Sequence, residues 1–332
     1  MKRLFLLLAA CLLGAATPSP PPPHWSVPQA QRLTEWLESA AADGLGPVSA
    51  EAPGIRSAMA GGEGAALDRS ATAAAIRLLA AYRQGCCNAS LRSGWHIALP
   101  AWPDAAAMVG DAVRANQLDR LFGTTRPAHP FYYSLREAYG RERDPARRAT
   151  LAANLDRWRW MPRALGERYL LVNAAAFEAS LWEGHRLVGR WRVVVGKTGS
   201  PTPIFAARVT GVIFNPWWEI PPSIAAEGIA ATVRNRPAEA ARKGYVLQNG
   251  RYRQRPGPAN ALGRMKLVMP NRFSVYLHDT PSQNLFERDI RAYSHGCVRV
   301  GDALGLAAAL LSADRSRVDG IVAAGRTEQV AL

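Results

Sequence analysis

The chain has 332 residues, of which 48% are hydrophobic and 20% are charged. This composition excludes a wholly disordered or fibrous protein, and the length is enough for two domains. The formal net charge is +15, so an anionic partner is expected: nucleic acid, an anionic membrane or an anionic polymer. Only Lys2, Lys197, Lys243 and Lys266 among the 41 basic residues are lysines, and such an arginine bias is also typical of a GC-rich genome, which weakens the nucleic-acid interpretation.

The N-terminus has the pattern of an export signal. Lys2 and Arg3 precede the apolar run Leu4–Leu13, which is too short to span a bilayer, and small residues follow up to Ala16. We expect a signal peptide over residues 1–16, and its cleavage leaves a net charge of +13 because two basic residues are lost. Alternatively, Leu8-Ala9-Ala10-Cys11 is similar to a lipobox, in which case Cys11 carries a lipid anchor.

A helical region is expected next. Residues 17–27 form a proline-rich linker, and residues 28–165 are expected to be a helical scaffold domain. Apolar residues at helical spacing predict helices over Pro28–Ala42, Ala66–Arg83 and Ala146–Met161. For the second of these helices, Asp68 or Ser70 is the expected N-terminal cap and Gly85 the expected stop.

The pattern changes near Arg168 from helical to strand spacing. Glu183-Gly184-His185 is a plausible hairpin turn between two strand-like runs. The expected strands are Tyr169–Val172, Phe177–Trp182, Leu187–Val195, Val209–Phe214 and Ser274–His278. The predicted fold class is therefore α+β, with a helical N-terminal region followed by a mainly β domain over residues 166–332.

The sharpest local signal is Ser294-His295-Gly296-Cys297-Val298-Arg299, with His278 nineteen positions before Cys297. In a strand over 274–278, alternation places Tyr276 and His278 on one face, so the imidazole faces a surface or groove. A nearby histidine takes the proton of a thiol, whose ordinary pKa is about 8.5, and returns it to a leaving amine. The glycine before the cysteine allows a tight turn and exposes backbone N–H groups that suit an oxyanion. The chemistry indicated is acyl transfer through a thioester.

A purely structural role for Cys297 and His278 stays open as an alternative to catalysis. A cysteine in a β domain is commonly a small core residue, and a histidine is commonly a hydrogen-bonded core or surface group. No CxxC or HExxH pattern is present, so neither a metal site nor a cofactor is expected. Trp217-Trp218 lines a groove or packs in the core, and Cys86-Cys87 is expected at a helix end without a function.

These residues resemble the L,D-transpeptidase catalytic (YkuD) domain, and more closely its YcbB-like branch of exported Gram-negative enzymes. The most specific match is Tyr276–Pro281 followed by Ser294–Arg299. The blocks that indicate the branch are Asn154–Pro162, Val193–Lys197, Phe214–Ile224 and Arg255–Arg264. The likeness is good over residues 150–315 and weak before them.

The resemblance implies a peptidoglycan L,D-transpeptidase of the periplasm. Such an enzyme takes a stem tetrapeptide as acyl donor and forms a cysteinyl thioester with release of D-alanine. A side-chain amine of diaminopimelate on a second stem then resolves the thioester and gives a crosslink between two diaminopimelates. The implied partners are therefore peptidoglycan stem peptides, and no metal is implied.

Carried over to this chain, the resemblance gives roles to particular residues. Cys297 is the nucleophile, and His278 is the general base and acid. The loop residues are expected to support the site: backbone at His295, Gly296 and Cys297 forms the oxyanion hole, Ser294 holds the loop or orients His278, and Arg299 supports the site or binds a substrate carboxylate. The expected substrate-binding residues are Tyr276, Trp217 and Trp218.

Two features depart from the YcbB-like pattern. Phe131–Arg143 runs almost directly into Ala149–Pro162, so the usual peptidoglycan-binding helical module is missing, and the capping segment between Pro222 and Arg255 is short. The acceptor therefore stays open: water would give an L,D-carboxypeptidase, and a lysine of an envelope lipoprotein would give a lipoprotein-attaching enzyme. A non-catalytic wall-binding scaffold is the alternative from another class. The short His–Cys spacing disfavours a sortase-like enzyme, and the export signal disfavours a nucleic-acid binder.

Overall fold

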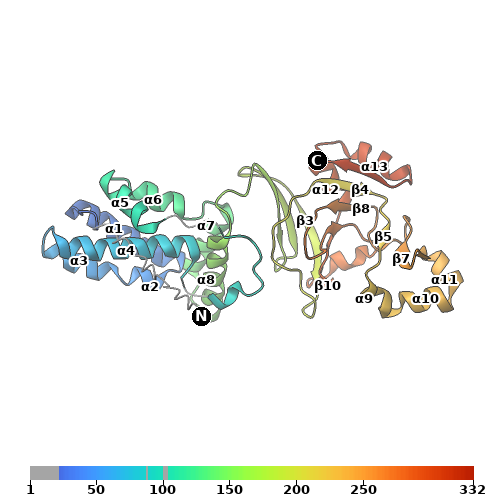
Figure 1. Cartoon of the computed structure of the whole chain (residues 1–332), viewed down its shortest axis with the longest axis horizontal. Helices are drawn as coiled ribbons and strands as arrows, with labels where there is room; N and C mark the ends of the chain where they lie inside the picture. The colour runs from blue at the N-terminus through green and yellow to red at the C-terminus, as the bar shows by residue number, and fades with distance from the viewer. Residues whose placement is uncertain (1–21, 87–88, 100–103) are drawn as a thin grey trace, which may run out of the picture. The chain divides into compact units, whose positions relative to one another are not determined.

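The computed structural model describes residues 22–86, 89–99 and 104–332. Contacts within the chain define two units, one helical and N-terminal, the other rich in β-strands and extending to the C-terminus (Figure 1). The α+β fold class, with helices first, is confirmed by the order of the elements. The expected signal peptide, Cys11 and Cys87 lie outside the described residues, and Cys86, just after a helix end, is disulfide-bonded.

The N-terminal half is built from helices that bury one apolar face each. Leu33, Leu37, Leu78 and Phe122 are fully buried in a single core. The helices are α1 Val27–Ala40, η1 Ala41–Asp43, α2 Gly46–Ser49, α3 Ala52–Ala60, α4 Ala65–Gln84, η2 Ala89–Arg92, α5 Ala105–Arg114, α6 Leu118–Thr125, α7 Pro130–Arg141 and α8 Pro145–Trp160.

The three helices predicted from the sequence correspond to α1, α4 and α8, with ends displaced by one or two residues. The predicted cap of α4 is wrong, because Gly64 is its N-cap and makes no side-chain hydrogen bond. Asp68 instead accepts the backbone N–H of Trp25 at 2.7 Å. Gly85 ends α4 as expected, with a φ of 72° that favours glycine.

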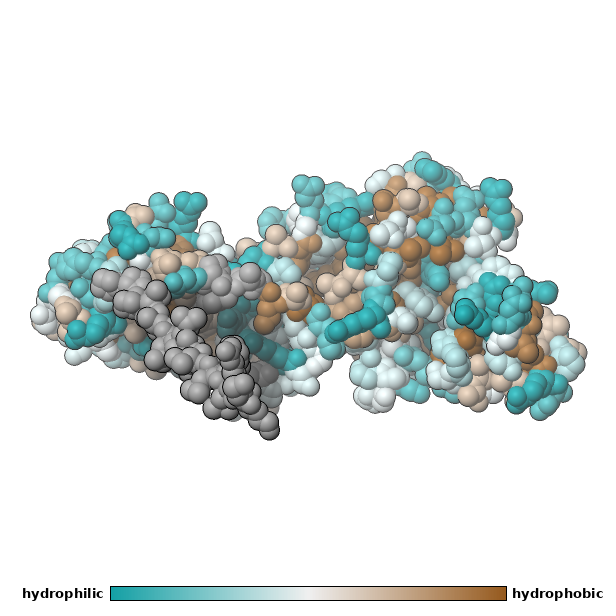
Figure 2. Space-filling model, viewed as in Figure 1, coloured by the Kyte–Doolittle hydropathy of each residue, from teal (hydrophilic) through white to brown (hydrophobic). Residues whose placement is uncertain are grey.

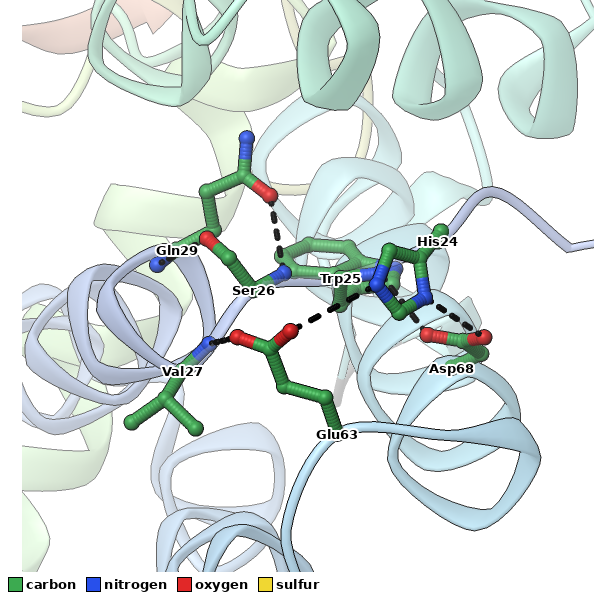
Figure 3. Close-up of polar contacts among 7 residues, drawn as sticks. All are labelled: His24, Trp25, Ser26, Val27, Gln29, Glu63 and Asp68. Carbon is green, nitrogen blue, oxygen red and sulfur yellow. Dashed lines mark hydrogen bonds and ion pairs between the residues drawn. The ribbon is translucent and has the colours of Figure 1, made fainter.

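The segment before α1 is fixed to α4 and to the loop that precedes it (Figure 3). Trp25 is fully buried, and its backbone N–H donates to Asp68. His24 lies between two carboxylates, 3.5 Å from Glu63 and 3.4 Å from Asp68. Ser26 caps α1 within a capping box. The chain that leaves the proline-rich linker is therefore anchored on the helical unit at Trp25.

A buried carboxylate lies at the centre of the helical unit. Asp43 is fully buried and accepts hydrogen bonds from the hydroxyls of Tyr82 and Tyr132, each at 2.9 Å. Its carboxylate also lies 3.1 Å from Nε of Arg136. The group joins the end of η1 to α4 and α7, so a polar network helps to fix the register of these helices.

The β-rich unit contains a mixed sheet with strand order β1-β2-β3-β11-β9-β8-β4-β12, and β10 pairs with β3. A second sheet has the order β5-β7-β6. The strands are β1 Arg168–Asn173, β2 Glu178–Glu183, β3 Arg186–Gly196, β4 Gly211–Phe214, β5 Trp218–Glu219, β6 Tyr245–Gln248, β7 Arg251–Gln254, β8 Met265–Val268, β9 Leu277–His278, β10 Ala292–Ser294, β11 Val298–Val300 and β12 Glu328–Ala331.

The predicted strands correspond to β1, β2, β3, β4 and β9, and the hairpin turn between β2 and β3 is confirmed at Gly184. The last prediction is too long. Only Leu277–His278 is a strand, because Ser274 has a φ of 54° and the side chain of Asn271 holds a turn there. Tyr276 therefore precedes the strand rather than lying within it.

The large sheet has its core on the side covered by α12 Ala303–Leu311 and α13 Arg315–Ala323. α12 contacts β3 and β8, and Leu306 is fully buried in the same core as Val193 and Phe214. Hydrophobic residues gather mainly over the β-rich unit in the space-filling view, whereas the visible face of the helical unit is largely hydrophilic (Figure 2).

Residues 222–255, the capping segment, form a small subdomain that includes β6 and β7 of the second sheet. The segment contains α9 Pro222–Ile224, η3 Ala225–Ile229, α10 Ala230–Asn235 and α11 Pro237–Arg242. Ile220 and Trp218 are buried next to it in a small core, which Tyr276 joins as a partly buried member. The small core connects the capping segment to the residue that precedes β9.

Residues 89–99, the strap, group with the β-rich unit although helices precede and follow them in the sequence. Trp95 forms a parallel β-bridge with Ile204, and the N–H of His96 donates to the Ile204 carbonyl at 2.8 Å. The ring of His96 lies 4.8 Å from that of Phe273. In the described parts of the chain, every helix is too short or too polar to cross a membrane.

Candidate active site

Strand pairing brings His278 next to the strand that follows Cys297. In the parallel pair of β9 and β11, Leu277 lies opposite Val298 and His278 lies opposite Arg299. Cys297 immediately precedes β11, and the N–H of Val298 donates to the carbonyl of Tyr276 at 3.0 Å. Cys297 therefore lies at the register position of Tyr276, and His278 lies two positions further along the neighbouring parallel strand.

Cys297 is a half-buried free thiol. Its Sγ lies 3.9 Å from the carbonyl oxygen of Ser274, and it interacts with the hydroxyl of Tyr276 through a hydrogen bond. Burial raises the pKa of the thiol, and this effect exceeds the opposing ones of Tyr276, Arg299 and Lys266. The sulfur is therefore mostly protonated near pH 7 before a substrate binds.

His278 is buried, with 5% of its surface exposed. Its Nδ1 lies 2.5 Å from the carbonyl oxygen of Asp279, so Nδ1–H donates there and Nε2 is the proton acceptor. Burial, with the nearby charges of Arg299 and Lys266, lowers the pKa of the imidazole to about 3. A neutral imidazole with a free Nε2 is the form that a general base requires.

Tyr276 lies between the two groups. Its ring is 5.5 Å from that of His278, and its hydroxyl hydrogen-bonds the sulfur of Cys297. The shared face expected for Tyr276 and His278 agrees with this ring contact. Among the described residues no hydrogen bond joins His278 directly to Cys297, so the thiol is held by Tyr276 and by the carbonyl of Ser274.

The side chain of Ser294 holds the loop Ser294–Cys297 together. The Ser294 hydroxyl donates to the carbonyl of Cys297 at 2.5 Å and accepts the N–H of Gly296 at 3.1 Å. Ser294 therefore holds the loop, as one of the two expected roles states, while the carbonyl of Asp279 orients His278. The Gly296 N–H is engaged by Ser294 in this structure, and the expected oxyanion hole at His295, Gly296 and Cys297 stays a prediction.

Thr202 is a supporting residue that no motif indicated. Its hydroxyl accepts the N–H of Gly196 at 2.9 Å and donates to the carbonyl of Gly296 at 2.8 Å. Gly196 approaches the same turn so closely that a Cβ there would lie 2.3 Å from the carbonyl oxygen of Ser200. The end of β3 and the catalytic loop are thus joined through one hydroxyl.

Asp279 fixes the strand that carries His278. Its carboxylate accepts the N–H of Arg264 at 2.8 Å, and its own N–H donates to the carbonyl of Met265 at 2.9 Å. Gly263 has a φ of 61°, and a Cβ at that position would lie 2.3 Å from the Asp279 carboxylate. The glycine in the Arg255–Arg264 block is therefore required by this close approach.

The remaining predicted residues lie around the capping segment. Trp218 is 8% exposed and packs in the small core, which confirms the core-packing alternative for that residue. The ring of Trp217 lies 4.4 Å from the guanidinium carbon of Arg253. His295 lies 3.2 Å from Glu227 in η3, so the capping segment contacts the catalytic loop one residue before Gly296.

The comparisons with known proteins follow the division of the chain. Residues 167–319 match the model of the L,D-transpeptidase catalytic domain (YkuD), and residues 21–138 match the model of a scaffold domain. The β-rich part of the chain is therefore similar to an L,D-transpeptidase catalytic domain, and the helical part before it is similar to a scaffold domain.

A relative of the chain is a Haemophilus influenzae protein named "Putative L,D-transpeptidase". The two are 31% identical over 182 residues, a stretch that covers 48% of this chain and 37% of the relative. The chain thus matches well under half of the relative's length.

Proposed function

We propose that this protein is a peptidoglycan L,D-transpeptidase that crosslinks two diaminopimelate residues through a thioester on Cys297. The observation that carries the proposal is the position of Cys297 directly before β11 and of His278 in the neighbouring parallel strand β9, with Tyr276 in contact with both residues. The match to the catalytic-domain model supports the substrate class.

The resting protonation states favour a concerted acylation step. Because thiol and imidazole are both neutral, the proton moves from Sγ to Nε2 of His278 as sulfur attacks the carbonyl carbon. The S–C bond forms, and His278 then protonates the nitrogen as the C–N bond breaks and D-alanine leaves. A diaminopimelate amine attacks the thioester next, and its proton returns through His278 to sulfur.

The charge and the N-terminal sequence support the setting of this reaction. Stem peptides carry carboxylates, and the net charge of +13 that remains after the expected cleavage favours encounter with them, more strongly at low salt. Export by the expected signal peptide would place the protein in the periplasm, with Cys11 as a possible lipid attachment. Water or the lysine of an envelope lipoprotein, the alternative acceptors, would react with the same thioester.

The experiment compares the wild-type protein without its signal peptide and the Cys297→Ala variant on a disaccharide-tetrapeptide, with products followed by mass spectrometry. A dimer that lacks one D-alanine, formed by the wild type only, is the expected result. Tripeptide alone would make the protein a carboxypeptidase on this substrate. Absence of product and of thioester would contradict the proposal.

The role of His278 has its own test. His278→Ala should lower turnover about 10²–10⁴-fold, the usual contribution of a general acid–base group. His185→Ala, at an exposed position in the turn before β3, is the matched control and should keep the wild-type rate. A His278→Ala protein with full turnover would remove His278 from the mechanism.

A further inference from the structure

Lys266 lies beside the reacting groups, although no motif indicated it. It is directly paired with His278 in the antiparallel contact of β8 and β9, and His278 is paired on its other side with Arg299 of β11. Side chains directly opposite one another on neighbouring strands project from the same face. Met265 and Leu267 are buried on the core face of β8, so Lys266 points to the opposite face. Two cationic side chains therefore flank the imidazole.

Among the described residues, neither cation has a carboxylate in direct contact. In the described chain, neither Lys266 nor Arg299 forms a side-chain hydrogen bond or ion pair. The Lys266 ammonium lies 5.2 Å from the ring centroid of Tyr276. Glu219 is the carboxylate whose charge acts on Lys266, but it is paired with Arg253 at 2.7 Å. A half-buried pair of cations without a carboxylate stabilises an anion that enters from outside.

The thiolate of Cys297 is not that anion in the resting protein. Burial raises the pKa of the thiol in spite of both cations, so the sulfur is mainly neutral near pH 7. Burial also lowers the pKa of Lys266 and of Arg299, an unfavourable effect that a bound carboxylate would reverse.

We propose that Lys266 and Arg299 form a subsite for the terminal carboxylate of the leaving amino acid of the acyl donor. The identity of the donor rests on the proposed function, whereas anion binding follows from the two cations alone. His278 lies between them in the same row and protonates the leaving amine, and the carboxylate of a C-terminal amino acid is one carbon from that amine. A carboxylate held there selects donors that end in a free carboxylate.

The first experiment needs no peptidoglycan. Alkylation of Cys297 by iodoacetate and by iodoacetamide is compared at one pH and low salt, so that the fraction of thiolate cancels in the ratio of the two rate constants. Lys266→Met should lower the iodoacetate-to-iodoacetamide ratio about tenfold, the effect of one partly screened charge. Lys266→Arg should keep the ratio.

The matched control is Lys243→Met, which removes the same charge at an exposed residue paired with Glu239. Its ratio should equal that of the wild type. An unchanged ratio in Lys266→Met, or an equal loss in Lys266→Arg, would overturn the subsite. Thermal unfolding of each variant checks that the fold is retained.

The second experiment identifies the carboxylate. Tetrapeptide donors that end in D-alanine or in its C-terminal amide are compared in the wild type and in Lys266→Met. The variant should raise KM about tenfold for the free acid and change the amide less than about twofold. An equal loss for both donors would overturn the assignment. If the wild type acts on neither donor, the proposed function fails, and the alkylation ratio still decides whether the subsite exists.

Discussion

At the residue scale, Cys297 and His278 are both neutral near pH 7. Burial raises the pKa of the thiol and lowers that of the imidazole to about 3. The pair therefore differs from a preformed thiolate–imidazolium, in which each group shifts toward its charged form. Because the thiolate is the reactive form of cysteine, the neutral thiol reacts slowly with other electrophiles.

Removal of the Tyr276 hydroxyl should change the pKa of the Cys297 thiol. The hydrogen bond from the Tyr276 side chain lowers the pKa of Cys297, so Tyr276→Phe should raise that pKa. The rate of iodoacetamide alkylation at pH 7 should therefore fall several-fold, by about tenfold at most. The pH profile of alkylation measures the shift. Tyr293→Phe, at an exposed position one residue before Ser294, should leave the profile unchanged, and an unaltered profile in Tyr276→Phe would contradict the contact.

At the element scale, the catalytic loop depends on one hydroxyl from a neighbouring turn. Thr202 joins Gly196, at the end of β3, to Gly296. Together with the two hydrogen bonds of Ser294 within the loop, this hydroxyl fixes the backbone around Gly296.

Thr202→Val should therefore loosen the loop. We expect the free energy of unfolding to fall by about 1 kcal/mol, the usual net contribution of a hydrogen bond, because Gly196 and Gly296 lose the hydroxyl that they share. Acylation of Cys297 should also become slower. Urea unfolding and the rate of thioester formation measure the two effects. Thr202→Ser keeps the hydroxyl and should restore both; equal effects of the two variants would contradict the hydroxyl's role.

The helical unit makes a similar use of Asp43. Because this carboxylate is fully buried among Tyr82, Tyr132 and Arg136, Asp43→Ala leaves polar partners unpaired. It should lower the free energy of unfolding by about 3–5 kcal/mol, whereas Asp111→Ala, which removes an exposed ion pair with Arg114, should change it by less than about 1 kcal/mol. Chemical denaturation followed by circular dichroism makes the comparison, and similar losses in both variants would contradict the network.

At the scale of the whole molecule, two histidines make the β-rich unit sensitive to acid. Burial lowers the pKa of His278 to about 3 and that of His129 to about 4. His129 accepts the N–H of Phe131 at Nδ1 and lies 3.0 Å from the hydroxyl of Tyr169. Both histidines are neutral in the folded protein at a pH where they would be charged in the unfolded chain.

Between about pH 6.5 and pH 4 the unfolded chain therefore binds more protons than the folded one, and stability falls on acidification. The slope should approach about 1.4 kcal/mol per pH unit for buried His278 and be smaller for half-buried His129. Urea unfolding at pH 7.5, 6.0 and 5.0 measures the fall. His129→Asn should flatten it relative to the wild type, and equal slopes would contradict the lowered pKa.

Local patterns predicted the parts of this protein that depend on local order. Helical spacing located α1, α4 and α8, and a compact motif located Cys297 with His278. The neighbours of these two residues come from strand register instead. Lys266 is paired with His278, and the Thr202 hydroxyl donates to the carbonyl of Gly296, because segments distant in the sequence come together. No spacing within the chain encodes such pairings, so both residues escaped prediction.

The path of the chain also limits how this protein can be divided. Residues 89–99 and 129–131 belong to the β-rich unit although helical segments lie between and after them. A fragment that begins at residue 160 would retain the catalytic motif but lack Trp95 and His96, whose backbones pair with Ile204. Phe273, which packs on His96, directly precedes the residue whose carbonyl faces the sulfur. A gene truncated at residue 160 would therefore encode the complete catalytic motif in a β-rich unit that lacks the strap. For the same reason, a single proteolytic cut could not release the two units intact.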